Sequence, residues 1–147
     1  MAAEEEGGLY CPGVAGDSFN TAVYLARARI PVTYLTQLGD DRFSDGIMHA
    51  LNRERIGAEH IKRLPGRQPG LYIISNDSDG ERHFHYWREN SPARETFAQV
   101  PELEQVTHFY FTGITLAVTR HDLVNLQKLL KTLGDSQCLI IFDPNYR

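Results

Sequence analysis

The sequence is poor in cysteine and has no long apolar run. Its two cysteines, Cys11 and Cys138, lie far apart and form no Cys-x-x-Cys spacing, which fits neither a disulfide framework nor a thiolate zinc site. No stretch approaches the roughly 18 apolar residues of a membrane span. The N-terminus is acidic, where a signal peptide would be basic and then apolar. We therefore expect reduced thiols, a cytoplasmic location and no membrane partner.

Positive charge is also in short supply. The chain has 15 Lys and Arg against 19 Asp and Glu, a formal net charge of −4. No general attraction to phosphate backbones follows from this balance, so nucleic acid is not an expected partner. With 41% hydrophobic and 23% charged residues in a length of 147, the composition is that of about one globular domain.

The N-terminal part predicts two helices around a strand. The first eight residues, small and acidic, are expected to form a flexible start. Asp17 is suited to cap a helix over 18–29. Residues 32–38 are β-branched and aromatic, which favours a strand, and the apolar spacing over 41–55 predicts a second helix.

A β-hairpin is the strongest local prediction. Residues 70–75 and 82–88 are strand-like and flank a polar turn in which Asp79-Gly80 suits positive φ. We expect this hairpin to project from the domain within about 61–90.

The C-terminal part predicts strand, helix and strand. Residues 108–112 form a compact strand, leucines recur at helical spacing over 119–133, and 139–142 is an apolar run typical of a parallel strand buried on both faces. The element order indicates an α/β domain with parallel strands. Because the chain opens on a helix and stops after a central strand, where α/β sheets build their sites, we expect an incomplete domain.

Several familiar motifs are missing. Residues 13–16 do not complete a Gly-x-Gly-x-x-Gly fingerprint, and neither a P-loop nor a Gly-x-Ser-x-Gly elbow occurs. Residues 77–80 resemble part of a calcium loop but lack its bidentate Glu. His83 and His85 share a strand face without an evident third ligand, so we expect no metal site.

Polar residues at element ends remain as candidates. Gly16, Asp17 and Asn20 fall in one helical turn, where they could either cap the helix or hold neighbouring hydroxyls of a polyol. Strand alternation places Tyr86 and Arg88 on one face of the hairpin, and Tyr72 on the partner strand could join them.

Two interpretations of this hairpin face stay open. An aromatic pair with an Arg can clamp a planar anion, because guanidinium pairs bidentately with carboxylate, but an exposed salt-bridged Arg fits the spacing equally well. Past the last strand, Asn145 and Arg147 form either part of a site or a simple loop.

Six short blocks of the sequence, given by their residue ranges below, together resemble the ribokinase-like (PfkB) carbohydrate kinases. Three of the six are most similar to the 2-keto-3-deoxygluconate kinases. The similarity runs from about Gly13 to Arg147, and the order and spacing of the blocks agree with the family. The family blocks are 15–22, 38–46 and 142–147, and those of the narrower group are 69–72, 80–82 and 86–88.

The resemblance implies a ribokinase-like, doubly wound parallel sheet, here incomplete, with a projecting β-hairpin lid that covers the sugar and often mediates dimerisation. It implies transfer of the γ-phosphoryl group of ATP, with Mg²⁺, to 2-keto-3-deoxygluconate, giving 2-keto-3-deoxy-6-phosphogluconate. The partners it implies are therefore a sugar acid, ATP and a second copy of the chain bound through the lid.

Site roles carry over from the family residue by residue. Those expected to hold sugar hydroxyls are Gly16, Asp17 and Asn20. Those expected to face the substrate from the lid are Tyr72, Tyr86 and Arg88, with Arg88 near the carboxylate. Those expected near the phosphates and the acid end of the substrate are Asn145 and Arg147.

The chain departs from the family pattern in three ways. Ala15 replaces the first Gly of the usual Gly-Gly-Asp, an initial strand is not expected, and no Gly-x-Gly-Asp motif occurs. That motif supplies the anion hole and general base, so we expect the base beyond Arg147, the nucleotide-binding half to be absent and this chain alone to be a poor kinase. The alternatives are a ribose or fructose kinase, a non-catalytic sugar-binding or dimerisation module, and a truncated product.

Overall fold

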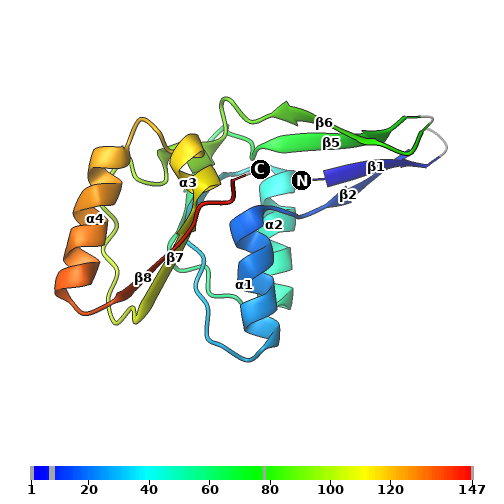
Figure 1. Cartoon of the computed structure of the whole chain (residues 1–147). Helices are drawn as coiled ribbons and strands as arrows, with labels where there is room; N and C mark the ends of the chain where they lie inside the picture. The colour runs from blue at the N-terminus through cyan, green and yellow to red at the C-terminus, as the bar shows by residue number, and fades with distance from the viewer. Residues whose placement is uncertain (1, 7–8, 78, 147) are drawn as a thin grey trace. The chain divides into compact units, whose positions relative to one another are not determined.

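A pair of helices, two parallel strands and a four-stranded sheet make up the first part of the chain, which ends at Pro92 (Figure 1). The second part begins at Ala93 and contains two helices and two parallel strands. This computed structural model describes residues 2–6, 9–77 and 79–146. Within these residues no helix is both long enough and apolar enough to cross a membrane.

The predicted order of helix, strand and helix is confirmed in the first part, and a further parallel strand follows that the sequence analysis did not predict. These elements are α1 (Asp17–Arg27), β3 (Thr36–Gly39), α2 (Arg42–Arg53) and the further strand β4 (Ile61–Leu64). Strands β3 and β4 pair in parallel around the crossover helix α2. Asp41 caps α2, since its Oδ1 accepts a hydrogen bond from the Ser44 N–H at 2.8 Å.

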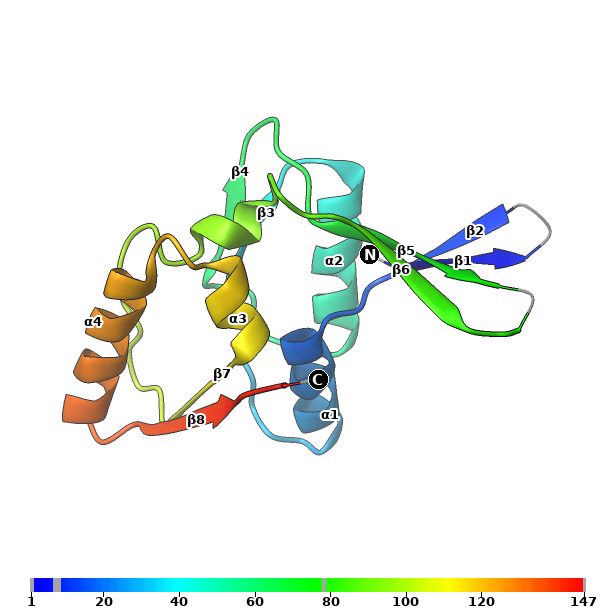
Figure 2. The ribbon, with the colours of Figure 1, turned by 45° about the horizontal axis from the view of Figure 1, so that its top comes forward.

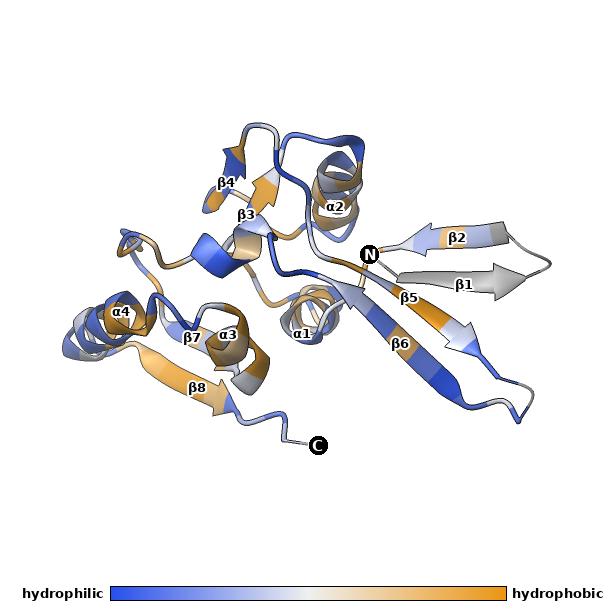
Figure 3. Ribbon diagram, turned by 90° about the horizontal axis from the view of Figure 1, so that it is seen from above, coloured by the Kyte–Doolittle hydropathy of each residue, from blue (hydrophilic) through white to orange (hydrophobic). Residues whose placement is uncertain are grey.

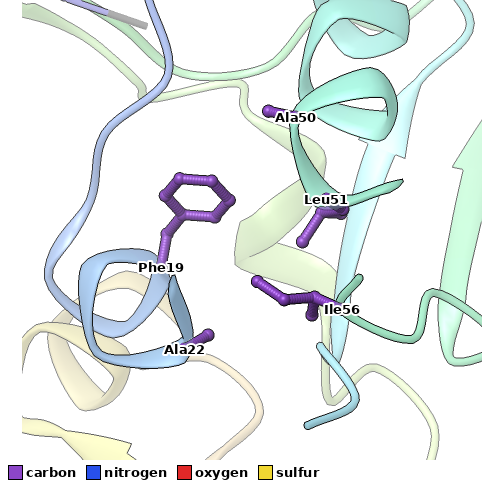
Figure 4. Packing of buried hydrophobic residues seen from close by; sticks show 5 residues of the cluster. All are labelled: Phe19, Ala22, Ala50, Leu51 and Ile56. Carbon is purple, nitrogen blue, oxygen red and sulfur yellow. The ribbon is translucent and has the colours of Figure 1, made fainter. Parts of the chain in front are cut away.

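The core of this part lies between α1 and α2. Figure 4 shows its buried side chains, which are Phe19, Ala22, Ala50, Leu51 and Ile56. The Phe19 ring meets Tyr34 edge to face at 6.1 Å, and the Tyr34 hydroxyl lies 2.8 Å from Ser18 Oγ. Burial raises the pKa of Tyr34, which is therefore a neutral member of this core.

The four-stranded sheet has the order β2-β1-β5-β6. Its strands are β1 (Ala2–Glu6), β2 (Leu9–Gly13), β5 (Leu71–Asn76) and β6 (Arg82–Trp87). Strand β1 is antiparallel to β2 and pairs in parallel with β5, where Glu4 lies opposite Ile74. Figures 1 and 2 show this sheet extending away from α1 and α2.

The predicted hairpin is confirmed as β5–β6. The two strands pair in register from Leu71–Trp87 to Asn76–Arg82, and Gly80 has φ of 80° in the connecting turn. Asp77 organises this turn, because its Oδ1 accepts the N–H groups of Asp79 and Glu81, each at 2.9 Å.

Two predictions for the N-terminus are wrong. Residues 2–6, expected to be flexible, form β1, so a strand does precede the first helix. Low β-propensity is overridden here because β1 has a partner strand on each side. Asp17 is not the helix cap: α1 begins at Asp17, the cap position is Gly16 in extended conformation, and no side chain caps it.

The strand predicted over 32–38 is shorter in the structure. Its ladder with β4 begins only at Thr36 and is preceded by one bridge between Thr33 and Gly57.

In the second part, β7 (His108–Thr112) and β8 (Leu139–Asp143) pair in parallel across α3 (Gly113–Val118) and α4 (Leu123–Asp135). The helix expected over 119–133 therefore begins later, at Leu123. A separate helix precedes it because the Thr112 hydroxyl and Thr115 form a capping box directly after β7. Helix α4 buries Leu126, Leu129 and Leu133 as its leucine spacing predicts.

Strand β8 is not buried on both faces, contrary to the prediction. Figure 3 shows it as hydrophobic along its length, yet Leu139 is 56% and Phe142 45% exposed. In the described residues β8 pairs only with β7, and α4 is the helix packed against it. The α/β class with parallel strands holds. The pairs β3–β4 and β7–β8 are two separate parallel pairs, and β1–β5 is a parallel pairing within the four-stranded sheet.

Candidate functional site at the base of the hairpin

An open cavity of about 470 Å³ lies where the hairpin joins the first part of the chain. One wall is the segment before β5, residues 66–69, and the other is the end of β6 with the residues after it, 86–91. Tyr86 and Arg88 both line this cavity, together with Trp87. The charged residues that line the cavity are Arg67, Arg88 and Glu89, so positive charge is in excess beside its aromatic surface, a composition that can accept an anionic ligand.

The structure brings Tyr72 beside Tyr86 and Arg88, the two residues that strand alternation placed on one face of the hairpin. Tyr72 lies directly opposite Tyr86 in the ladder, with ring centroids 5.7 Å apart. The Arg88 guanidinium carbon is 4.6 Å from the centre of the Tyr86 ring, a cation–π contact. Phe84 stacks on the other side of Tyr86 at 6.2 Å. The face is thus a row of two aromatic rings ending in a cation, with Tyr72 beside it.

Arg88 is exposed at the end of this row. No carboxylate of the described residues forms an ion pair with its guanidinium, so the alternative of a structural salt bridge is not what the structure shows. Burial and the neighbouring Tyr86 raise the pKa of Tyr72, whose hydroxyl stays protonated and can donate a hydrogen bond.

On the opposite face of the hairpin, the histidines contact other residues of the hairpin itself. His83 Nε2 lies 2.9 Å from Asp77 Oδ2, and His85 Nε2 lies 3.3 Å from Ser75 Oγ. His83 and the backbone N–H groups of the turn lower the pKa of the Asp77 carboxyl. These contacts give both histidines structural partners within the hairpin. Among the described residues no three His, Cys, Asp or Glu side chains gather as metal ligands.

Gly16, Asp17 and Asn20 lie in the first turn of α1, and the Asn20 N–H donates to the Gly16 carbonyl at 2.8 Å. A methyl group at Gly16 would lie 3.7 Å from Phe19 Cβ, an ordinary contact. Asn20 is exposed and lines a second cavity of about 330 Å³ between α1 and α2, together with Arg53 and Glu54. These three residues do not line the cavity of Tyr86 and Arg88.

The two remaining predicted site residues belong to the second part of the chain. Asn145 follows β8 with φ of 42°, and its N–H donates to Asp143 Oδ1 at 2.9 Å. Arg147 lies outside the described residues. The structure therefore gives Asn145 a turn geometry and does not test its predicted place near phosphates.

Arg67 was missed by the sequence analysis. It precedes the hairpin in a polar segment with no periodic pattern, so nothing in its neighbours singled it out. Only the fold brings it to the cavity wall facing Arg88.

The comparisons with known proteins are consistent across the chain. Residues 12–147 match the family described as pfkB family carbohydrate kinase. The chain is 36% identical to a 2-dehydro-3-deoxygluconokinase of Escherichia coli over 97% of its length, and 38% identical to one of Haemophilus influenzae over 90%. It spans about half the length of these curated relatives, 50% and 46% respectively.

Solved structures share the fold at lower identity. A PfkB protein from Polaromonas superposes with a TM-score of 0.89 at 24% identity, over all of this chain and 53% of that one. A 2-dehydro-3-deoxygluconokinase from Thermotoga maritima gives 0.85 at 22% identity over 99% and 48%. A fructokinase from Vibrio cholerae, bound to fructose, ADP and calcium, gives 0.75 at 22% over 99% and 48%.

Proposed function

Because this chain belongs to the PfkB family of carbohydrate kinases, we propose that it supplies the sugar-acid-binding part of a 2-keto-3-deoxygluconate kinase. The reaction is ATP-dependent phosphorylation of 2-keto-3-deoxygluconate to 2-keto-3-deoxy-6-phosphogluconate. Relatives that carry this activity in their names support the substrate, and the family supports the phosphoryl transfer.

One observation carries the choice of a sugar acid: the Arg88 guanidinium is exposed, without a carboxylate partner in the described residues, at the end of the aromatic row. A sugar acid brings a carboxylate that pairs with guanidinium in a charge-assisted, bidentate way, whereas ribose and fructose carry no charge to match it. Tyr72 and Tyr86 then cover the apolar side of the sugar carbons, and the hairpin is its lid.

The first turn of α1 completes the proposed sugar site. Asp17 and Asn20 hold the sugar hydroxyls, because a carboxylate accepts and an amide both donates and accepts hydrogen bonds. Gly16 keeps the backbone beside them free of a side chain. Since these residues do not line the hairpin cavity in the structure, the proposal has the sugar bridging two surfaces of the first part of the chain.

The proposal assigns fewer residues of this chain to the nucleotide than to the sugar. In the family the phosphate donor is ATP with Mg²⁺, and the resemblance assigns Asn145 and Arg147 to the phosphate side. The Gly-x-Gly-Asp motif that holds the general base does not occur in the sequence. Sugar binding is the part of the activity that this proposal assigns to the described residues, and Arg147 lies outside them. A second copy pairing through the exposed edge of β6 is part of the same proposal.

Trp87, the only tryptophan, sits next to Arg88 and reports on this site directly. Titrating the chain with 2-keto-3-deoxygluconate is expected to change Trp87 fluorescence, and ribose and fructose are the neutral controls. Arg88→Ala is expected to raise the Kd for the sugar acid at least tenfold, since hydrogen bonds to charged groups contribute about 1.5–3 kcal/mol. Arg82→Ala, which removes the same charge from the far end of β6, is the matched control.

Two outcomes contradict the proposal. An unchanged Kd for the sugar acid in Arg88→Ala would show that Arg88 does not bind its carboxylate. Tighter binding of fructose than of the sugar acid would indicate that the chain belongs to a kinase of neutral sugars. ADP formation with ATP, Mg²⁺ and the sugar acid tests the phosphoryl transfer separately, and its absence with intact binding is the result expected if the general base lies outside these residues.

A further inference from the structure

Arg67 connects the two segments that enter and leave the hairpin. It lies between β4 and β5, and its Nη2 donates a hydrogen bond to the carbonyl oxygen of Asn90 at 3.0 Å. Asn90 is two residues beyond Arg88, in the segment that follows β6. The contact therefore ties the wall before the hairpin to the wall that carries the proposed carboxylate-binding arginine.

The backbone of Arg67 is itself held in place by the end of β3. The Gly66 N–H donates to Asp40 Oδ1 at 2.9 Å, and Gly66 has φ of 68°. A methyl group on Gly39 would lie 1.8 Å from the Arg67 carbonyl oxygen, so the two backbones pack without room for a side chain. Because the base of the Arg67 side chain is fixed, its guanidinium reaches Asn90 from a defined position.

The segment that receives this hydrogen bond has a defined conformation too. The Ser91 N–H donates to the Arg88 carbonyl at 3.2 Å, closing a turn over 88–91. Arg88 packs on Gly70, where an added methyl group would lie 3.1 Å from Arg88 Cβ. The position of Arg88 is thus set by Gly70 on one side and by the turn that Arg67 holds on the other.

We propose that Arg67 is a positioning residue: by holding the carbonyl of Asn90, it fixes the turn over 88–91 and aims Arg88 into the cavity. The inference rests on the proposed function for the role of Arg88, and it adds a residue that neither the sequence pattern nor the family resemblance assigned. A hydrogen bond from a charged guanidinium to a backbone carbonyl is strong enough for this purpose, since it is about twice as strong as a neutral one.

The first test needs no ligand. In Arg67→Ala, hydrogen exchange of the Ser91 amide is expected to accelerate about tenfold, because the turn loses the hydrogen bond that Arg67 donates to Asn90. Arg67→Met keeps the aliphatic stem and removes the donors, so it gives the same result if the alanine variant does not fold. Arg67→Lys keeps a charge and a donor and is expected to recover most of the protection, while Arg82→Ala leaves it unchanged.

The second test measures affinity with the Trp87 signal. Arg67→Met is expected to raise the Kd for 2-keto-3-deoxygluconate about tenfold while the thermal midpoint of the chain stays within about 2 °C, and Arg67→Lys to restore most of the affinity. Weaker binding with unchanged Ser91 exchange would overturn the proposal, since Arg67 would then act by its charge alone.

The two tests separate this inference from the proposed function. If the unmodified chain does not bind the sugar acid, the proposed function fails, while faster Ser91 exchange in Arg67→Met still supports Arg67 as the residue that sets Arg88. If the chain binds and Ser91 exchange does not respond to Arg67→Met, the proposed function stands and the positioning role is wrong.

Discussion

The helix pair α1–α2 and the hairpin β5–β6 use similar side chains in opposite ways. Leu51 is fully buried and Phe19 is 8% exposed, whereas Tyr86 and Trp87 are 53% and 57% exposed. Burial of apolar area stabilises the helices at about 25 cal/mol per Å², a contribution that the hairpin aromatics largely forgo. This aromatic surface contributes little to stability and ends in a cation that has no carboxylate partner in the described residues, which supports the ligand site proposed above.

The largest effect on stability is expected from a substitution in the buried core between α1 and α2. Leu51→Ala leaves a cavity between α1 and α2 and is expected to lower the free energy of unfolding by about 2–5 kcal/mol. Urea unfolding followed by circular dichroism measures it. Ile30→Ala, a truncation of a half-exposed side chain, is the control, and equal losses in the two variants would show that this core does not hold the helices together.

A smaller effect on stability, with a larger one on binding, is expected on the exposed side. Tyr86→Leu removes the ring under Arg88 and is expected to change the free energy of unfolding by less than about 1 kcal/mol, the size of an exposed cation–π contact. Affinity for the sugar acid is expected to fall severalfold in the Trp87 titration. Phe84→Leu, one ring further from Arg88, should affect binding less, and the reverse order would place the ligand nearer the hairpin tip.

The smallest effect concerns pH and the hairpin turn. His83 and the turn N–H groups lower the folded pKa of Asp77 below its ordinary value of 3.8. The contribution of Asp77 is therefore fully present above about that value and is lost as pH falls through the lower folded pKa. Amide resonances of Glu81 followed by NMR from pH 5 to 2 are expected to report this loss.

Asp77→Asn removes the titrating group and is expected to flatten that transition, whereas Asp79→Asn should leave it in place. A transition that persists in Asp77→Asn would assign the acid sensitivity to another carboxyl group.

The sequence predicted the hairpin better than the strand beside it. Alternating β-formers on both sides of Asp79-Gly80 predicted a two-stranded hairpin and the faces of its strands, and the structure adds their register. Strand β1 carries no such signal, because an Ala and Glu sequence becomes a strand only once β2 and β5 flank it. The same limit applies to β8, whose apolar run predicted burial that the described residues do not supply.

The candidate site divides along the same line. Strand alternation grouped Tyr86 with Arg88 and left Tyr72 as a residue that could join them, and the structure brings all three together. Arg67 could not be found, because its partner is the carbonyl of Asn90, and backbone groups leave no mark in residue type. Asp17 suited a helix cap by its chemistry, but the helix begins one residue earlier than that role requires.

The parallel pairing of β1 with β5 also bears on how the chain folds. The β1–β2 and β5–β6 hairpins are local and can close within about 1–10 μs. Pairing β1 with β5 brings Glu4 opposite Ile74 and closes a loop that contains both helices. The entropy cost of closing this long loop is offset only after the intervening chain has ordered. We therefore expect the pairing of β1 with β5 to form later in folding than either hairpin.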